Sequence, residues 1–230
     1  TMVNLTMDGK QITVSKTATI YQAAQEAGVD IPVLCYAKKL FPYGACRVCL
    51  VEVEQMKGRL IPSCTTPVTE GMVVTTMSDE IRKVRKTVLE FLLVNHVLDC
   101  PVCDKGGECD LQDLAYEYEV NTNRFEGEAF DLPKDEVNPL IERNMNRCVL
   151  CGKCARVCDE VVGYGSYSFI NRGFETKIAT AFDRGLSCEF CGQCVSMCPV
   201  GAILPRPFKF KARPWQLTEV DSAYCYGGNR

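Results

Sequence analysis

Two closely spaced cysteine runs constrain this chain more than any other feature of its sequence. Each run has the spacing C-x2-C-x2-C-x3-C, and Pro199 directly follows the second. The first run consists of Cys148, Cys151, Cys154 and Cys158, and the second of Cys188, Cys191, Cys194 and Cys198. This spacing is typical of ligands to iron–sulfur clusters, whereas a zinc site gains nothing from the third and fourth cysteines. The runs therefore predict a small domain built around two [4Fe-4S] clusters.

The fourth cysteine of each run is expected to serve the cluster of the other run. Three cysteines two residues apart can ligate three irons of one cubane, and in two-cluster ferredoxins the fourth ligand comes from the other run. We call the resulting sets site 3, with Cys148, Cys151, Cys154 and Cys198, and site 4, with Cys188, Cys191, Cys194 and Cys158. Asp159, and not a proline, follows Cys158. Because the crossing joins both halves of the region, its folding should depend on metal.

Composition limits what else the cysteines could do. The 230 residues contain 16 cysteines, several times ordinary usage, while the apolar fraction of 47% is that of a globular protein. Disulfides are disfavoured because such frameworks belong mostly to small secreted domains, and the chain does not open with a signal-peptide pattern. A net charge of −3 argues against nucleic acid as the main partner, and no apolar stretch is long enough for membrane insertion. We expect a cytoplasmic protein with reduced or metal-bound thiols.

Residues 1–77 are expected to form a small α+β domain. Apolar and polar residues alternate on both sides of Asp8-Gly9, which predicts a hairpin. Thr17 is predicted to cap a short helix that Gly28 closes. Further strands are predicted over residues 48–54, 59–62 and 72–76.

Four cysteines of this first domain form a candidate site, which we call site 1. Its members are Cys35, Cys46, Cys49 and Cys64. Their spacing departs from the plant-type ferredoxin pattern, but four thiolates with Gly44 in the ligand loop suit a [2Fe-2S] cluster. A tetrahedral zinc ion is the alternative that the spacing alone leaves open.

The only histidine of the chain belongs to another candidate set, which we call site 2. Ser78 and the two acidic residues after it predict the start of a helix, whose apolar period continues to position 95. The members of site 2 follow this helix and are His96, Cys100, Cys103 and Cys109. A lone histidine at a helix end is more often a surface or capping residue. Here, however, three cysteines lack a fourth donor, and His96 lies one helical turn from Cys100.

These patterns divide the chain into five segments. They are a [2Fe-2S] domain at 1–77, a His/Cys3 domain at 78–118, a surface linker at 119–137, a two-[4Fe-4S] domain at 138–208 and a tail at 209–230.

Three segments resemble the N-terminal iron–sulfur region of the large subunit of NADH–quinone oxidoreductase. They are residues 32–35, 46–52 and 96–112, and the similarity extends over residues 3–208. The same segments are equally similar to iron-only hydrogenases, NAD-dependent formate dehydrogenases and electron-bifurcating oxidoreductases. The resemblance implies a β-grasp [2Fe-2S] ferredoxin-like domain, a small helical domain whose [4Fe-4S] cluster includes His96 as a ligand, and a bacterial-ferredoxin-like domain with two [4Fe-4S] clusters.

The resemblance also implies a function in electron transfer. The chain would be the electron-transfer subunit of a multisubunit NAD(H)-linked, flavin-based oxidoreductase of the bifurcating transhydrogenase, hydrogenase or formate dehydrogenase type. FMN and NAD(H) are expected on a partner subunit, because the sequence lacks a G-x-G-x-x-G fingerprint. A single histidine offers no catalytic triad, so no substrate site is expected on this chain. The expected partners are a flavin/NAD-binding subunit, a small [2Fe-2S] subunit and, as a further candidate, ferredoxin.

The end of the sequence supports an alternative. Residues 213–217, leading to Cys225-Tyr226-Gly227, resemble the entrance to a molybdopterin-type catalytic domain, whose first ligand cysteine would be Cys225. The chain would then be the N-terminal fragment of a catalytic molybdopterin oxidoreductase or of a respiratory-complex large subunit. Respiratory members usually carry fewer cysteines in the last region, so the full double run favours the other branches. Without such a domain, Cys225 is a free thiol.

Overall fold

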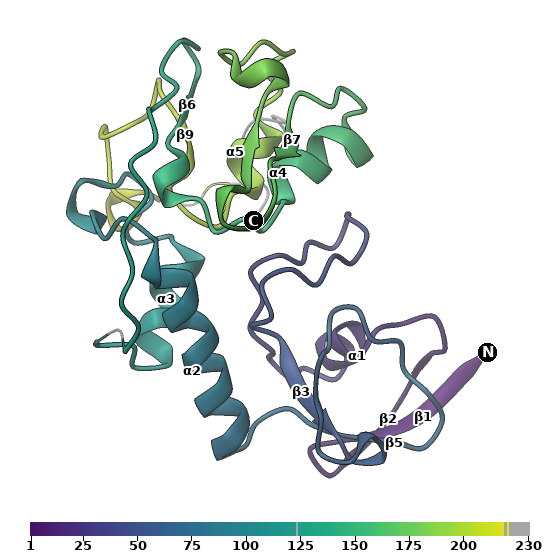
Figure 1. Cartoon of the computed structure of the whole chain (residues 1–230). Coiled ribbons are helices and arrows are strands. Elements are labelled where there is room, and N and C mark those ends of the chain that lie inside the picture. Colours follow the sequence, from purple (N-terminus) through teal and green to yellow (C-terminus); the bar gives the residue numbers. More distant parts are fainter. Residues whose placement is uncertain (123, 219, 221–230) are drawn as a thin grey trace.

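The computed structural model describes residues 1–122, 124–218 and 220 of the chain. A β-sheet with one covering helix lies at the N-terminal end, and an irregular cysteine-rich region lies at the other (Figure 1). Two helices, α2 (Asp79–Val94) and α3 (Asp110–Glu117), connect these parts along one side. Within the described residues, no helix combines the length and the apolar character needed to cross a membrane.

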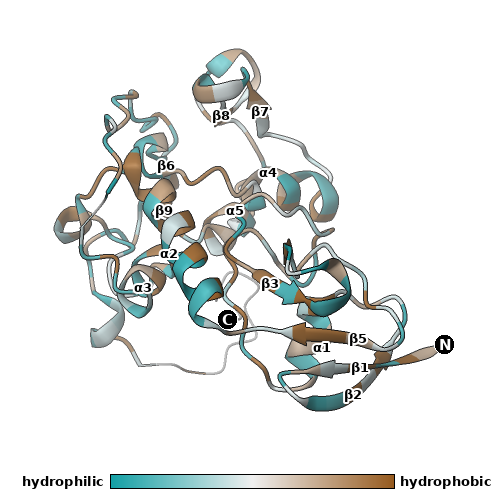
Figure 2. Cartoon of the chain, turned by 60° about the horizontal axis from the view of Figure 1, so that its bottom comes forward, coloured by the Kyte–Doolittle hydropathy of each residue, from teal (hydrophilic) through white to brown (hydrophobic). Residues whose placement is uncertain are grey.

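The N-terminal part is a five-stranded mixed sheet with the strand order β2-β1-β5-β3-β4. Its strands are β1 (Met2–Met7), β2 (Lys10–Ser15), β3 (Leu50–Val53), β4 (Leu60–Pro62) and β5 (Met72–Thr75). β1 pairs in parallel with β5, and the other neighbours are antiparallel. The predicted hairpin is confirmed, since Asp8 and Gly9 have the positive φ values, 47° and 80°, that a two-residue turn requires. Hydrophobic residues concentrate along β5 (Figure 2), which lies between β1 and β3.

The helix α1 (Ile20–Glu26) packs its buried residues into the core of this sheet. The prediction that Thr17 caps it was wrong, because Thr19 is the capping residue. The Thr19 hydroxyl accepts a hydrogen bond from the Gln22 backbone N–H at 3.3 Å, and the Gln22 side chain accepts one from the Thr19 N–H at 2.8 Å. This reciprocal pair satisfies two N–H groups that a helix start leaves unpaired. The Thr17 hydroxyl pairs with that of Ser15 instead.

Arg85 of α2 connects the sheet to the helices. Its side chain is completely buried, and its guanidinium donates hydrogen bonds to the carbonyl oxygens of Leu50 (2.8 Å) and Thr76 (2.9 Å). A further hydrogen bond of 3.0 Å reaches the hydroxyl of Tyr118, directly after α3. One cation therefore joins β3, the end of β5 and α3. The predicted start of α2 is confirmed, with Ser78 as its cap.

The cysteine-rich region contains two strand pairs and two short helices. They are β6 (Ile141–Arg143) with β9 (Ile203–Pro205), β7 (Ser168–Ile170) with β8 (Lys177–Ala179), α4 (Lys153–Arg156) and α5 (Gln193–Met197). The first three cysteines of each run share one backbone geometry. Leu150 and Phe190 have φ values of 51° and 53°, and Gly152 and Gly192 have 71° and 76° just before α4 and α5. The fourth cysteines differ, because Cys158 lies in a π-helical turn, Val157–Val161, whereas the backbone of Cys198 is extended.

Segment 119–137, predicted as a surface linker, has no helix or strand among its described residues but packs along α2. The Phe125 ring stacks on Phe91 at a centroid distance of 4.3 Å. The side-chain amide of Asn95 donates a hydrogen bond of 2.8 Å to the Glu128 carbonyl. These contacts hold the segment against the helix that precedes site 2.

We expect Arg85→Met to lower the free energy of unfolding by about 3 kcal/mol, because it leaves two buried carbonyl oxygens and a buried hydroxyl without their donor. Tyr118→Phe removes one of these bonds and should cost about 1 kcal/mol. Urea unfolding followed by circular dichroism measures both. Lys83→Met, on the exposed face of the same helix, is the matched control. An equal loss in Lys83→Met would contradict the role of Arg85.

Candidate metal centres

The four cysteines of site 1 converge between two loops and the sheet. All four are buried, and they come from the loop before Cys46, the start of β3 and the end of β4. The thiols of Cys46 and Cys64 hydrogen-bond to the sulfur of Cys35, which lowers the pKa of Cys35 to about 2. The pKa of Cys64 is raised in turn, by its bonds to Cys35 and Cys49. Site 1 is therefore a compact sulfur cluster before any metal is considered.

Site 2 follows the C-terminus of α2. Cys100 begins a tight helical turn, Cys103 is buried, and Cys109 precedes α3. Burial raises the pKa of Cys109 to about 11, and the charge of Cys103 adds to this effect. Burial lowers the pKa of His96, whose Nδ1 is buried without a hydrogen-bond partner. A neutral imidazole with a free ring nitrogen is the form that ligates metals.

Sites 3 and 4 are two separate cavities. One cavity is lined by all four cysteines of site 3 together with apolar side chains, including Ile178 and Val200. The other is lined by all four cysteines of site 4, with Tyr167 in its wall. Cys198 thus lies with the first run and Cys158 with the second. The sulfurs line cavity walls, and nowhere in the described ranges do three or more His, Cys, Asp or Glu side chains surround a single ion position.

Buried cations surround the thiols of site 3. Burial raises the pKa of Cys148 and of Cys151 to about 12, and it also raises that of Cys198. Three largely buried side chains oppose this effect, namely Arg143 beside Cys148, Lys153 beside Cys151 and Lys105 beside Cys198. Positive charge next to a thiol stabilises the thiolate, which is the form that binds metal.

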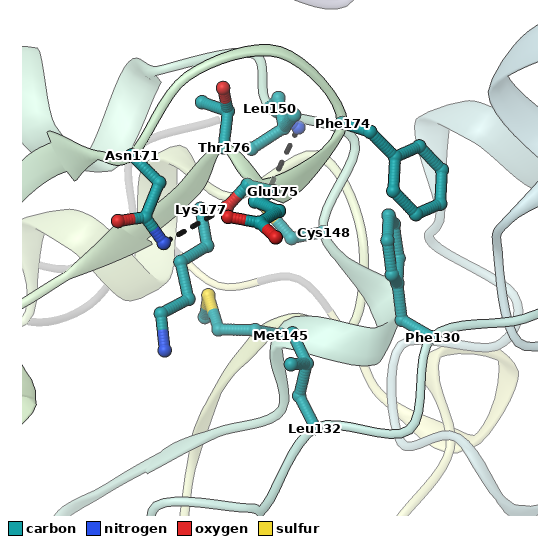
Figure 3. A pocket seen from close by; sticks show the side chains of 10 residues that line it. All are labelled: Phe130, Leu132, Met145, Cys148, Leu150, Asn171, Phe174, Glu175, Thr176 and Lys177. Carbon is teal, nitrogen blue, oxygen red and sulfur yellow. Dashed lines mark hydrogen bonds between the residues drawn. The ribbon is translucent and has the colours of Figure 1, made fainter.

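Cys148 also borders an open groove beneath the β7–β8 hairpin. Figure 3 shows Phe130 and Phe174 facing each other at one end of this groove, and their ring centroids are 5.3 Å apart. Leu132 and Met145 lie on the side of Cys148 away from the hairpin. The backbone N–H of Leu150 donates to the Cys148 sulfur at 3.4 Å. Cys148 and Met145 line both this groove and the cavity of site 3, which are therefore adjacent.

Site 3 lies next to site 1. The Arg156 guanidinium, from α4, donates to the carbonyl oxygens of Cys35 at 2.7 Å and Phe41 at 2.5 Å. It also lies 5.0 Å from the ring centroid of Tyr43. The ligand loop of site 1 is therefore fixed to the helix that carries Cys154 of site 3. The charge of Cys35 also contributes to the raised pKa of Cys151.

Site 3 also lies next to site 2. Arg147, directly before Cys148, is buried and forms an ion pair of 2.5 Å with Asp99, directly before Cys100. A Cβ atom at Gly201 would lie 2.3 Å from the sulfur of Cys103, so a glycine is needed where the loop after Cys198 approaches site 2. The two ligand loops are thus in direct contact.

Arg213, which belongs to the C-terminal tail, contacts the loop of site 2. Its guanidinium donates to the carbonyl oxygens of Cys103 at 2.6 Å and Pro101 at 2.9 Å. The Trp215 ring lies against Gly107, where a Cβ atom would come within 2.7 Å of it. Cys225, predicted as a free thiol or a further ligand, lies outside the described residues.

The residues that join the sites were not identified from the sequence. Arg147 and Arg156 lie within or beside the first run, and only their complete or partial burial next to cysteines distinguishes them from surface arginines. Tyr167 and Gly201 carry no motif of their own. The position of Gly201, three residues after Cys198, was the one signal that could have pointed to it.

Comparisons with known proteins identify iron–sulfur domains along the chain. A 2Fe-2S iron–sulfur cluster binding domain matches residues 1–79. The iron–sulfur binding region of NADH-ubiquinone oxidoreductase-G matches residues 85–124, and the ferredoxin-like domain of NADH-quinone oxidoreductase subunit 3 matches residues 138–204. The chain thus contains iron–sulfur domains of the 2Fe-2S and 4Fe-4S types.

Two curated relatives match nearly the whole chain. The chain is 47% identical over 230 residues to the NADPH-Fe(3+) oxidoreductase subunit alpha of Geobacter sulfurreducens, covering 99% of this chain and 27% of that protein. It is 43% identical over 224 residues to a NADH-quinone oxidoreductase G-type subunit of Rhizobium meliloti, covering 96% of this chain and 26% of that protein. The chain therefore spans about a quarter of the length of these relatives.

A solved structure is also similar over nearly its full length. It belongs to a NAD+-reducing [NiFe]-hydrogenase in the H2-reduced state, with a TM-score of 0.85 and 30% sequence identity. The match covers 91% of this chain and 90% of that one.

Paired substitutions test the ligand sets of sites 3 and 4. We expect Cys198→Ala and Cys151→Ala each to lower bound iron by up to about four atoms per chain, because each removes a ligand of the same cluster. The double variant should lose no more iron than either single variant. Cys198→Ala combined with Cys191→Ala should lose about twice as much iron as either single variant, because Cys191 belongs to the set of site 4. Iron analysis of anaerobically purified protein measures these losses, and the opposite pattern would show that Cys198 serves site 4.

Proposed function

The chain belongs to the family of the N-terminal iron–sulfur region of the large iron–sulfur subunit of NADH–quinone oxidoreductase, and on this premise we propose that it is the electron-transfer subunit of an NAD(H)-linked oxidoreductase complex. It would relay single electrons between a flavin-containing partner subunit and a further acceptor or donor. Iron–sulfur clusters supply the one-electron chemistry when they are bound. The residues of the chain hold the ligand sets at fixed mutual positions and bury most of their sulfurs.

One observation carries this proposal: site 3 is in contact with all three other sites. Arg156 joins it to the loop of site 1, and the Arg147–Asp99 ion pair joins it to site 2. The helix α4, which carries Cys154, packs against α5, which carries Cys194, and this links site 3 to site 4. The ligand sets therefore form a path from site 1 through site 3 to site 2, with site 4 as a branch. An arrangement of adjacent redox sites is what an electron relay requires, and it serves no purpose for isolated structural ions.

The residues fit one [2Fe-2S] cluster and three [4Fe-4S] clusters. We assign the [2Fe-2S] cluster to site 1, where four thiols already interact with one another. The orphaned Nδ1 of His96 supports a cluster at site 2, with the histidine as its fourth ligand. Two cavities, each lined by one four-cysteine set, support one [4Fe-4S] cluster each at sites 3 and 4.

We further propose the domain boundaries expected from the sequence. The last strand of the sheet ends at Thr75 and α2 is capped by Ser78, which supports a β-grasp domain over 1–77. α3 ends at Glu117, and β9 ends at Pro205, which support a His/Cys3 domain over 78–118 and a two-[4Fe-4S] domain over 138–208. Segment 119–137 connects these two domains, and residues 209–230 form the tail.

The proposed partners supply the cofactor-binding sites for which this sequence has no motif. FMN and NAD(H) are placed on a flavin/NAD-binding subunit, because this sequence has no dinucleotide fingerprint. A small [2Fe-2S] subunit of the same complex and ferredoxin are the further candidates. A reducing compartment such as the cytoplasm suits a chain with this many thiols.

Metal analysis tests the proposal most directly. We expect about 14 iron atoms and a similar amount of acid-labile sulfide per chain in anaerobically purified protein. The reduced protein should show the EPR signals of one [2Fe-2S] cluster and several [4Fe-4S] clusters. Stoichiometric zinc with almost no iron would overturn the proposal.

His96→Cys should lower the midpoint potential of site 2. A thiolate in place of neutral imidazole adds negative charge to the cluster and disfavours its reduction, by the logic that gives histidine-ligated Rieske centres their higher potentials. Redox titration followed by EPR measures the shift, with iron analysis to confirm that the cluster is retained. Sites 1, 3 and 4 in the same sample are the internal control. An unchanged potential with the cluster present would exclude His96 as a ligand.

A further inference from the structure

Tyr167 brings its hydroxyl to one sulfur of site 4. The residue directly precedes β7, and its side chain is only 4% exposed. Its hydroxyl oxygen lies 3.6 Å from the sulfur of Cys194. A cysteine sulfur bound to iron carries no proton, so in the loaded protein the tyrosine is the donor of this hydrogen bond.

The surroundings of Tyr167 hold its ring in place. The Arg143 guanidinium lies over the ring at 5.3 Å from its centroid. Arg143 is in turn fixed by an ion pair of 2.9 Å with Asp135 and by a hydrogen bond to the Ile178 carbonyl at 3.3 Å. The hydroxyl is therefore held in position beside Cys194, and it is not a mobile surface group that touches the sulfur by chance.

Two hydrogen bonds distinguish site 4 from site 3, namely the one from Tyr167 and one of 3.2 Å from the Ser166 backbone N–H to the Cys158 sulfur. The loops around the first three cysteines of the two runs are otherwise equivalent. The backbone N–H of Leu150 donates to Cys148 at 3.4 Å, and that of Phe190 donates to Cys188 at the same distance. Cys154 occupies in the first run the position that Cys194 occupies in the second. Among the hydrogen bonds of the described residues, Cys154 receives none from a side-chain hydroxyl, whereas Cys194 does.

We propose that the Tyr167 hydroxyl raises the reduction potential of site 4 by hydrogen bonding to the Cys194 sulfur. The inference rests on the proposed function, since it requires a cluster at site 4. An added electron increases the negative charge on the sulfurs, so a donor to one of them stabilises the reduced form. Sites 3 and 4 are neighbours, and an electron that reaches this pair divides between them according to their potentials. The hydrogen bond from Tyr167 thus increases the fraction of electrons that reside on site 4, the branch of the proposed path.

Tyr167→Phe tests this inference, because it removes the hydroxyl and keeps the ring. We expect the midpoint potential of site 4 alone to shift to a more negative value in an EPR-monitored titration. At partial reduction with dithionite, the fraction of electrons on site 4 should fall relative to site 3. Tyr116→Phe is the matched control, because Tyr116 is 76% exposed on α3. An unchanged potential in Tyr167→Phe, with all clusters present, would overturn the inference.

Two further measurements distinguish a failure of this inference from a failure of the proposed function. Resonance Raman spectra of the wild-type protein should show an iron–thiolate band that shifts between H2O and D2O, and Tyr167→Phe should reduce this shift to the part that the backbone N–H donors cause. If Tyr167→Phe fails to retain its clusters, 3-fluorotyrosine at position 167 replaces it, since its more acidic hydroxyl should move the potential of site 4 to a more positive value. An unchanged potential of site 4 in the 3-fluorotyrosine variant would overturn the inference. Absence of a cluster from site 4 in the wild-type protein would instead contradict the proposed function.

Discussion

Buried negative charge is the constraint that the rest of this structure has to satisfy. A thiol must lose its proton to bind metal, yet burial raises the pKa of Cys148 and Cys151 to about 12. The raised pKa values keep the thiols of site 3 neutral at physiological pH when no metal is bound, so the buried Lys153 beside Cys151 then lacks the thiolate charge that would balance it. Arg143 and Lys105 also have carboxylate partners, Asp135 and Glu108. We therefore expect the folding of the cysteine-rich region to depend on metal binding.

Two further cations act as spacers between the sites. Arg147 and Arg156 each extend from the first run to a ligand loop of another site, where they bind a carboxylate or backbone carbonyl oxygens. Arginine suits this role, because its planar fork donates several hydrogen bonds while its charge offsets nearby thiolates. Arg147 and Arg156 therefore help to fix the distances between the sites, on which electron transfer depends steeply.

The sequence allowed the local features to be predicted and left the long-range ones hidden. Cysteine spacing identifies the two runs, because ligands to one cluster must lie close together, and the Asp8-Gly9 turn and the Ser78 cap depend only on neighbouring residues. Thr17 was mistaken for the cap of α1 because two threonines flank the helix start and only the reciprocal bond to Gln22 selects Thr19. Tyr167 could not have been found, since its role depends on Cys194, which is 27 residues away along the chain.

The proposed exchange of fourth ligands between the two runs has a consequence for protein synthesis. A chain leaves the ribosome from its N-terminus, so Cys148, Cys151 and Cys154 emerge well before Cys198, which lies in their cavity. Cys158 likewise emerges before the cysteines of the second run with which it lines a cavity. Every ligand of sites 1 and 2, in contrast, precedes residue 110. With the proposed ligand sets, the N-terminal half of a nascent chain would accept its clusters first, whereas site 4 is complete only after residue 194, and site 3 only after residue 198, has been translated.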